Sequence, residues 1–406
     1  MALDLEQVVS QISGMVDRLR SGEQEKRLKL ERAIETLRLH AGKVDELSAK
    51  QERSKSKTTW LVAGLTNEGL AAGLGLPPIP TDYTSLATDG SHIDVDRHQS
   101  ATCYLINIGK VSLSYGSGPD ATLGSAPFLY YDDEQMVVAS LEPGQDGQRV
   151  EGAILGAKRM IEECRALAAM VGAATRDRPA VALLDGSLVL WDLEGKKYLD
   201  FVVDALVKNG LLKCLDELQQ ACTAGRIAFG SYISSPRSTE VVNLLRVALC
   251  PFDSPDCDRY CKGKGKELRE CEGVAGLRDS SIFAELLAPG ERSAVFTSHS
   301  RVVDRHYGNH RIRFFYLNVQ DEIARIEVPL WVAQRKDLVD IAHSLVFDQC
   351  RKGDGYPVAL AEAHEKAVLT VSDREQFWRL VELTMVSQGA SASVSAKSRS
   401  KRRPFV

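Results

Sequence analysis

Residues 181–191 read VALLDGSLVLW, an apolar run interrupted by an aspartate, a glycine and a serine. Such a run is typical of a strand buried in a sheet. An unpaired buried carboxylate would cost roughly several kcal/mol, so Asp185 must be paired, bind a metal, or lie where the strand reaches solvent. The same Asp-Gly-Ser recurs in LATDGSHI, residues 86–93, which gives Asp89 an equivalent setting.

The composition is that of a soluble globular protein: 406 residues, of which 44% are hydrophobic and 26% charged. The first nineteen residues include acidic side chains where a secretory signal needs a basic start and an apolar core, so we expect a cytoplasmic protein. In that compartment the nine cysteines are expected to be thiols or metal ligands rather than a disulfide framework. The net charge of −4 gives no global argument for nucleic-acid binding.

The two ends of the chain differ from its middle. Residues 1–57 are rich in Leu, Glu, Lys and Arg, which predicts an N-terminal amphipathic arm of one or two helices, broken near 21–24. Its apolar residues recur mostly at steps of three, four or seven: Leu5, Val8, Ile12, Val16, Leu19, Leu30, Ile34, Leu37 and Val44. We expect this stripe to pack on the body or on another subunit. Residues 387–406 contain five basic residues and no acidic one, which predicts a disordered basic tail.

The middle of the chain, residues 58–386, has a mixed α/β pattern. Strands are expected near 85–93, 101–108 and 110–115, then a helix over 149–172, the strand in 181–191, a helix near 200–221, a strand near 226–233 and a helix near 238–249. The glycine between 101–108 and 110–115 suggests a hairpin there. This order is expected of a ribonuclease H-like mixed sheet flanked by helices, although a doubly wound sheet with a different start fits the same periodicity.

Asp89 and Asp185 are candidate metal ligands in such a fold. Functional groups of α/β sheets collect at strand ends, where two carboxylates on neighbouring strands can share a divalent cation. The glycine after each aspartate would let the backbone turn, and the serine could bond a carboxylate or cap the next segment. Asp-Gly is also one of the commonest turn dipeptides, so a plain turn is the competing interpretation.

Residues 353–368, GDGYPVALAEAHEKAV, predict the start of a helix. Pro357 suits the first helical position and Tyr356 the cap before it, and the alanine-rich run that follows favours a helix. Tyr356, Leu360 and His364 step by four, so the tyrosine and the histidine can flank one helix face.

The order of these motifs resembles the NurA family of DNA-repair nucleases over about residues 80–386. It comprises two Asp-Gly-Ser elements with a glutamate-containing helix between them, ISSPRS at 233–238, and Gly-Tyr-Pro-x-x-Leu-x-x-Ala-His at 355–364. The last motif is the part of this resemblance that is specific to the family. The resemblance implies a manganese-dependent deoxyribonuclease, with magnesium as the alternative metal. It implies a 5′–3′ exonuclease with single-strand endonuclease activity on DNA ends in double-strand-break repair, a homodimer, and a HerA-like hexameric ATPase partner.

The resemblance also assigns site residues. Asp89 and Asp185 correspond to the metal carboxylates, and Tyr356 and His364 complete the site. The family has a further acid on the helix between the aspartates, for which Glu163 is our choice because it borders the apolar face, with Glu151 as the alternative. The resulting catalytic set has residue types that suit phosphodiester hydrolysis, since carboxylates hold divalent ions. His364 could ligate manganese or carry a proton, and Tyr356 could orient a phosphate.

Arg237, in ISSPRS, is a candidate phosphate contact, with a solvated surface arginine as the alternative. Four cysteines lie close together in a polar segment: Cys250, Cys257, Cys261 and Cys271. They could bind a structural zinc, although their gaps of six, three and nine residues do not match paired Cys-x-x-Cys spacing. The interpretation of these cysteines therefore stays open.

The chain has no Gly-x-x-x-x-Gly-Lys-Ser/Thr motif, so we expect ATP hydrolysis to belong to the partner. Two other functions fit the same residues. One is a non-catalytic adaptor of this fold that holds a motor on DNA, and the other is a different ribonuclease H-like nuclease, such as a junction resolvase.

Overall fold

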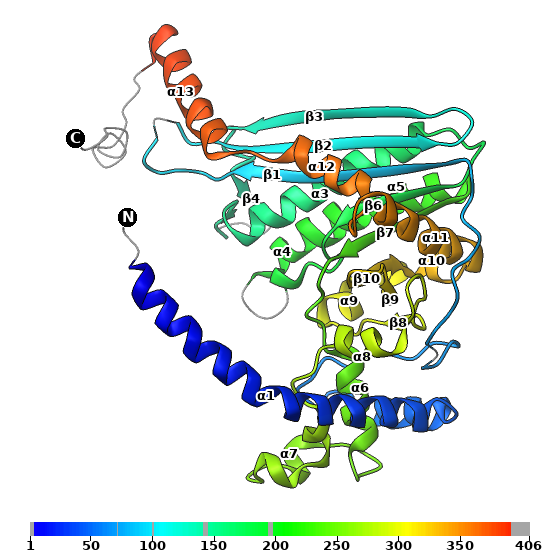
Figure 1. Ribbon diagram of the computed structural model, residues 1–406. Coiled ribbons are helices and arrows are strands. Elements are labelled where there is room, and N and C mark those ends of the chain that lie inside the picture. Colours follow the sequence, from blue (N-terminus) through cyan, green and yellow to red (C-terminus); the bar gives the residue numbers. More distant parts are fainter. Residues whose placement is uncertain (1–3, 71, 100, 141–144, 194–197, 391–406) are drawn as a thin grey trace. The chain divides into compact units, whose positions relative to one another are not determined.

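The computed structural model describes residues 4–70, 72–99, 101–140, 145–193 and 198–390 (Figure 1). From residue 391 on, the tail expected to be disordered lies outside these residues. Two compact units make up the chain: one of Met1–Leu76, Ser234–Ser300 and Arg313–Arg325, the other of Pro77–Ile233, Arg301–Ile312 and Ile326–Val406. Among the described helices, none combines the length and the apolar character that crossing a membrane requires.

The second unit is built on a mixed sheet with the strand order β3-β2-β1-β6-β7-β10. The strands are β1 Tyr83–Ile93, β2 Tyr104–Tyr115, β3 Asp120–Tyr130, β6 Ala180–Asp185, β7 Ile227–Ile233 and β10 Ile323–Pro329, which begins in the first unit. β1 pairs antiparallel with β2 and parallel with β6, β2 pairs antiparallel with β3, and β6 pairs parallel with β7. This arrangement of antiparallel and parallel strands confirms the ribonuclease H-like mixed sheet.

Helices lie on both faces of this sheet. α3, Ala153–Ala173, packs on β1, and α12, Val358–Ala367, packs on β1 and β2 from the other side (Figure 1). α11, Lys336–Lys352, lies against β6 and β7. The remaining elements of this unit are β4 Val137–Val138, β5 Gln148–Arg149, η1 Trp191–Leu193, α4 Asp200–Val203, η2 Asp204–Leu211, α5 Leu212–Thr223, α9 Arg301–His306, η5 Gly308–His310, α10 Leu330–Ala333 and α13 Val371–Ser387.

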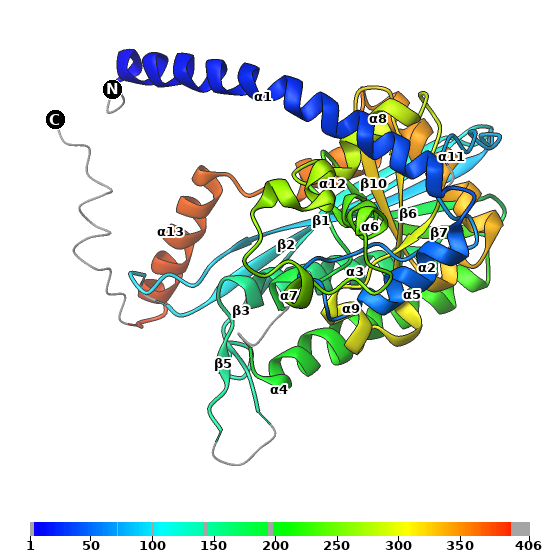
Figure 2. The ribbon, with the colours of Figure 1, turned by 90° about the horizontal axis from the view of Figure 1, so that it is seen from below.

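The first unit contains the strand order β10-β9-β8, with β9 at Ile312–Asn318 and β8 at Phe296–Thr297. Its helices are α1 Leu5–His40, α2 Val44–Ser54, α6 Glu240–Leu249, α7 Cys257–Tyr260, η3 Lys266–Leu268, η4 Glu270–Val274 and α8 Asp279–Leu286. The C-terminal half of α1 buries Ala33 and Leu37 in a hydrophobic cluster with Leu244 of α6 and Phe283 of α8. α1 is thus anchored through one half of its length (Figure 2).

α1 is continuous, so the break expected near residues 21–24 is wrong. A single Gly22 does not interrupt a helix whose flanking residues are strong helix formers. Ion pairs between Lys29 and Glu25 and between Arg27 and Glu31, each one helical turn apart, support the segment that follows.

The hairpin expected at Gly109 is also wrong. Gly109 lies inside the continuous strand β2, and the turn comes after Tyr115, where Gly116 has φ +97°. The partner strand is β3, which the sequence did not reveal because most of its residues are exposed and carry no clear apolar alternation.

Candidate active site

Asp185 is the last residue of β6 and is exposed to solvent. Gly186 follows with φ +81°, a conformation that favours glycine, and its amide donates to the carbonyl of Tyr232 at 2.9 Å. The next residues are held by Glu327, whose Oε2 accepts from the Ser187 hydroxyl and the Leu188 amide, both at 2.8 Å. This aspartate therefore stands at a fixed strand end, as its motif predicted.

Asp89 differs, because it lies inside β1 rather than at its end, and β1 continues to Ile93. Gly90 has no positive φ and makes no turn, so the expectation that glycine serves a turn at this copy is wrong. The structure gives another reason for it. A Cβ at position 90 would lie 2.5 Å from Oε1 of Glu163 and 3.0 Å from Cγ of Arg159, so only glycine leaves room for the α3 side chains.

Glu163 is the acid that α3 brings to this place. Its side chain is 4% exposed, and its backbone carbonyl accepts from the hydroxyl of Thr88, which fixes α3 on β1. Burial raises the pKa of Glu163 to about 8; the nearby Arg159 opposes this shift, whereas the negative charges of Asp89 and Asp185 add to it. Both aspartates are thus close enough to Glu163 to influence its ionisation.

α12 reaches the opposite face of β1 and β2 because Gly109 leaves room for it. Gly109 is the register partner of Asp89, and a Cβ there would lie 2.1 Å from the carbonyl oxygen of Ala363. The C-terminal end of α12 is then held by its Ala367 carbonyl, which accepts from Ser91 Oγ at 2.5 Å and Asn107 Nδ2 at 2.9 Å. These contacts set the position of His364, the residue after Ala363.

His364 and Tyr356 each meet one of the aspartates. The Nδ1 atom of His364 lies 2.8 Å from Oδ2 of Asp89, and the imidazole is 60% exposed. The Tyr356 hydroxyl donates to Asp185, and its ring packs edge-on against Tyr232 at 5.3 Å. Burial raises the pKa of Tyr356, and the charge of Asp185 adds to this shift, so the phenol stays protonated at neutral pH.

The helix begins at Val358 with Pro357 as its N-cap, one residue later than the sequence suggested, so Tyr356 precedes the helix.

Asp185 has a raised pKa although part of the residue is exposed. The protein around its carboxylate removes some of its hydration and Asp89 repels its charge, while the hydrogen bond from Tyr356 opposes the shift. The structure therefore brings together Asp89, Glu163, Asp185, Tyr356 and His364, all within the second unit.

The carboxylate cluster can be compared with the needs of a divalent metal ion. Within the described parts of the chain, no group of three or more His, Cys, Asp or Glu side chains is placed so that it could hold a metal ion. The chemistry of the donors nevertheless fits, since three carboxylates and an imidazole are ligands for manganese or magnesium. Oε1 of Glu163 is buried and, within the described residues, accepts no hydrogen bond, although Nε of Arg159 lies 3.1 Å away. A divalent cation would add positive charge to that of Arg159 among the three carboxylates.

The comparisons with known proteins bear on this arrangement. A model of the NurA domain matches residues 83–369. The chain belongs to the NurA domain family. This family consists of nucleases involved in DNA repair, and the match includes all five residues named above.

Among solved structures, LC9-RNase H1, a type 1 RNase H with the type 2 active-site motif, is 12% identical over 40% of this chain and 69% of its own, with a TM-score of 0.19. No curated protein matches.

The remaining candidates lie elsewhere. Glu151 precedes α3 of the NurA domain and is exposed. Its Oε1 lies 3.8 Å from Nη1 of Arg149. Glu151 is not among the groups that shift the pKa of Glu163 or of Asp185. Arg237 is exposed in the loop between β7 and α6, in the first unit, and its contact with DNA stays a prediction.

Sequence reasoning missed the ion pair of Arg159 with Glu163. The position of Arg159, four residues before Glu163 on a predicted helix, was the available signal.

The raised pKa of Glu163 predicts a pH-dependent stability. A carboxyl whose pKa is raised from about 4.5 to about 8 on folding costs stability as the pH increases through that window, because the folded state must then hold a buried charge. In a chelator, Glu163→Gln should melt at a higher temperature than the unchanged protein, and the difference should grow between pH 5 and pH 8. Thermal denaturation measures this. The exposed Glu151→Gln is the matched control and should show no growing difference, and a constant gap for Glu163→Gln would contradict the assignment.

Proposed function

We propose that this protein is a metal-dependent deoxyribonuclease that hydrolyses phosphodiester bonds at DNA ends in double-strand-break repair. The observation that carries the proposal is the meeting of Asp89, Asp185 and the buried Glu163, with its raised pKa, inside a NurA domain. A 5′–3′ exonuclease with single-strand endonuclease activity, using manganese or magnesium, is the form of activity that we infer from the family resemblance.

Asp89, Asp185 and Glu163 would hold the metal, with His364 as a further ligand or as a proton carrier. When bound, divalent ions stabilise the negative charge on the attacking and leaving oxygens of a phosphodiester. The oxygen-rich donor set suits such hard cations, and it would be held by strands and helices rather than by mobile loops.

Side chains beside the carboxylates are suited to proton transfer and to binding the phosphate. Asp89 faces Nδ1 of His364, which orients the ring and leaves Nε2 free to exchange a proton at the exposed edge. Tyr356 stays protonated, so it can donate a hydrogen bond near Asp185. Arg159 is a partly exposed cation beside Glu163 and is suited to a phosphate oxygen.

Removal of one metal-holding charge tests the proposal. Asp185→Asn and Asp89→Asn keep the shape of the side chain, so folding should persist while cleavage of end-labelled linear DNA in manganese falls by roughly 100-fold or more. Double-stranded and single-stranded DNA, each with manganese, magnesium or a chelator, give the strand and metal preference. Asp133→Asn, at an exposed acid, should cleave normally.

A folded Asp185→Asn protein that cuts at the normal manganese-dependent rate would show that the metal site is wrong. Unchanged protein that binds DNA but never cuts it, whatever the metal, would instead favour a non-catalytic adaptor.

We further propose that a second copy of the chain covers the exposed half of α1. Five apolar residues are exposed there at alternating steps of four and three, the spacing of a coiled-coil seam: Leu5, Val9, Ile12, Val16 and Leu19. Val9 is exposed in this stripe, and Val8 of the original pattern, which lies at its edge, is half-buried. A stripe of this length left in water is unfavourable, and a symmetric pair of helices would bury it.

Two charges placed in the stripe should separate the dimer. Ile12→Glu with Val16→Glu puts like charges into the seam, so light scattering coupled to gel filtration should report a monomer at micromolar concentration where the unchanged protein is a dimer. The matched control is Ser10→Glu with Gln11→Glu, which adds the same charge on the outer face of α1 and should remain dimeric. A dimer that survives the first pair of changes would exclude the arm as its interface.

A HerA-like hexameric ATPase is the partner that we infer from the family resemblance. The chain itself carries no Gly-x-x-x-x-Gly-Lys-Ser/Thr motif for nucleotide phosphates, so a motor would have to be a separate protein.

A further inference from the structure

The four clustered cysteines surround a single small cavity in the first unit. This cavity has a volume of about 20 Å³, and its lining includes Cys250, Cys257, Cys261 and Cys271 together with the aromatic side chains of Trp60, Phe252 and Tyr260. The thiols come from separate places along the chain. Cys250 caps the C-terminal end of α6, Cys257 begins α7, Cys261 follows α7, and Cys271 lies in η4.

Local structure explains why these residues converge. Cys257 and Cys261 are one helical turn apart, and the amide of Cys261 donates to the carbonyl of Cys257 at 3.0 Å, so both lie on one side of α7. Asp256 caps this short helix by accepting from the amide of Arg259 at 2.9 Å. Phe252 stacks on Tyr260 with ring centroids 3.9 Å apart. The segment between α6 and α8 is therefore folded back on itself, although it has few buried apolar residues of its own.

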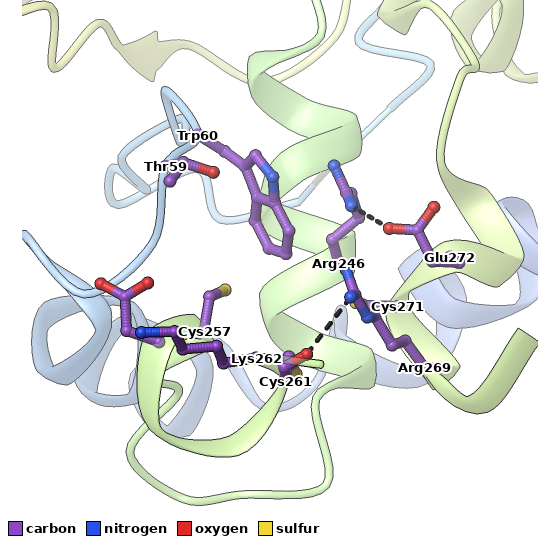
Figure 3. A pocket seen from close by; sticks show the side chains of 10 residues that line it. Thr59, Trp60, Arg246, Cys257, Cys261, Lys262, Arg269, Cys271 and Glu272 are labelled. Carbon is purple, nitrogen blue, oxygen red and sulfur yellow. Dashed lines mark hydrogen bonds and ion pairs between the residues drawn. The ribbon is translucent and has the colours of Figure 1, made fainter. Parts of the chain in front are cut away.

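Positive groups lie around the thiols. Three of the cysteines, Cys257, Cys261 and Cys271, also border an adjoining hollow of about 300 Å³ with Arg246 and Arg269, as Figure 3 shows. Arg246 stacks on Trp60, with its guanidinium carbon 3.6 Å from the ring centroid, and pairs with Glu272 at 2.6 Å (Figure 3).

Arg246 and Arg269 each have one buried N–H group without an acceptor among the described residues. Arg269 donates through its terminal nitrogen to the carbonyl of Cys261 at 3.2 Å. The Nε atoms of both Arg246 and Arg269 are buried and have no hydrogen-bond partner in the described part of the chain. Buried donors of this kind need an acceptor, and a thiolate sulfur would serve.

We propose that Cys250, Cys257, Cys261 and Cys271 bind one structural Zn²⁺ ion as thiolates. Zinc in structural sites takes four ligands in a tetrahedron, with Zn–S distances of about 2.3 Å, and all four cysteines line this one cavity. With their side chains as they stand, the thiols do not form a group that could hold a metal ion, so binding requires them to turn. Rotation about each Cα–Cβ bond re-aims a cysteine sulfur among three staggered positions without moving the backbone.

The charge around the thiols agrees with this site. A zinc ion with four thiolates carries two negative charges, which the guanidinium groups of Arg246 and Arg269 can offset. Zinc binding would displace the protons of these thiols and close the loop-rich segment between α6 and α8.

The proposal does not depend on the nuclease activity, because the cysteines and the carboxylate cluster belong to different units. The first experiment measures metal content. Protein purified without chelator should contain one equivalent of zinc by elemental mass spectrometry. Cys257→Ala with Cys261→Ala should lose it, whereas Cys103→Ala with Cys222→Ala, which changes two buried thiols elsewhere, should retain it.

A second measurement keeps the test valid if the double variant fails to fold. Cobalt(II) added to the reduced, metal-free unchanged protein should give sulfur-to-cobalt charge-transfer absorption and the strong visible bands of a tetrahedral site, saturating at one equivalent. Added zinc should abolish both. Absence of these bands in the reduced protein, or disulfides among the four cysteines in protein purified without oxidant, would overturn the proposal.

Discussion

Glu163 can approach the sheet only because residue 90 has no side chain, and the geometry of the candidate site depends on this contact. A Cβ at Gly90 would take the place of the carboxylate, at 2.5 Å from its Oε1. The Glu163 side chain would then have to turn away from β1, while the hydrogen bond from Thr88 to the Glu163 carbonyl holds α3 on the strand. The acid on the helix and the aspartate on the strand can share one site because α3 lies this close to the backbone.

On the other face of the sheet, too, a glycine leaves room for a helix. Neighbouring residues of a strand point to opposite faces, so Gly90 faces α3, while Asp89 and its register partner Gly109 face α12. Gly109 lets the backbone of α12 approach where a side chain would collide with Ala363. Two glycines on adjacent strands therefore admit an acid from one layer and a histidine from the other. Both side chains are held by regular structure, which limits their motion relative to Asp89.

Much of this could be predicted from the sequence, and the failures have physical reasons. The apolar run that ends at Asp185 identified a buried strand and its end, because both are local features. β3 was missed because its residues are largely exposed, so little burial shapes its pattern. Gly90 and Gly109 leave room for helices that lie far away along the chain, and the local sequence around each glycine does not show such a contact. The set of five site residues came from the family resemblance; their spacing alone left a plain turn as an equal interpretation.

Two buried acids in this chain differ in how the surrounding protein compensates their charge. Asp279 is fully buried, yet both of its oxygens accept hydrogen bonds, from the amides of Val241 and Val242 and from the hydroxyl of Tyr316. Burial raises its pKa to about 6, and these donors oppose the shift. Glu163 is almost as buried, but its pKa rises to about 8, with two other carboxyl groups nearby and no hydrogen bond to Oε1 from the described residues. A group arranged only for stability would have the donors that Asp279 has. The cluster around Glu163 instead costs stability when it is ionised, and carboxyl groups with pKa values perturbed in this way gather at functional sites.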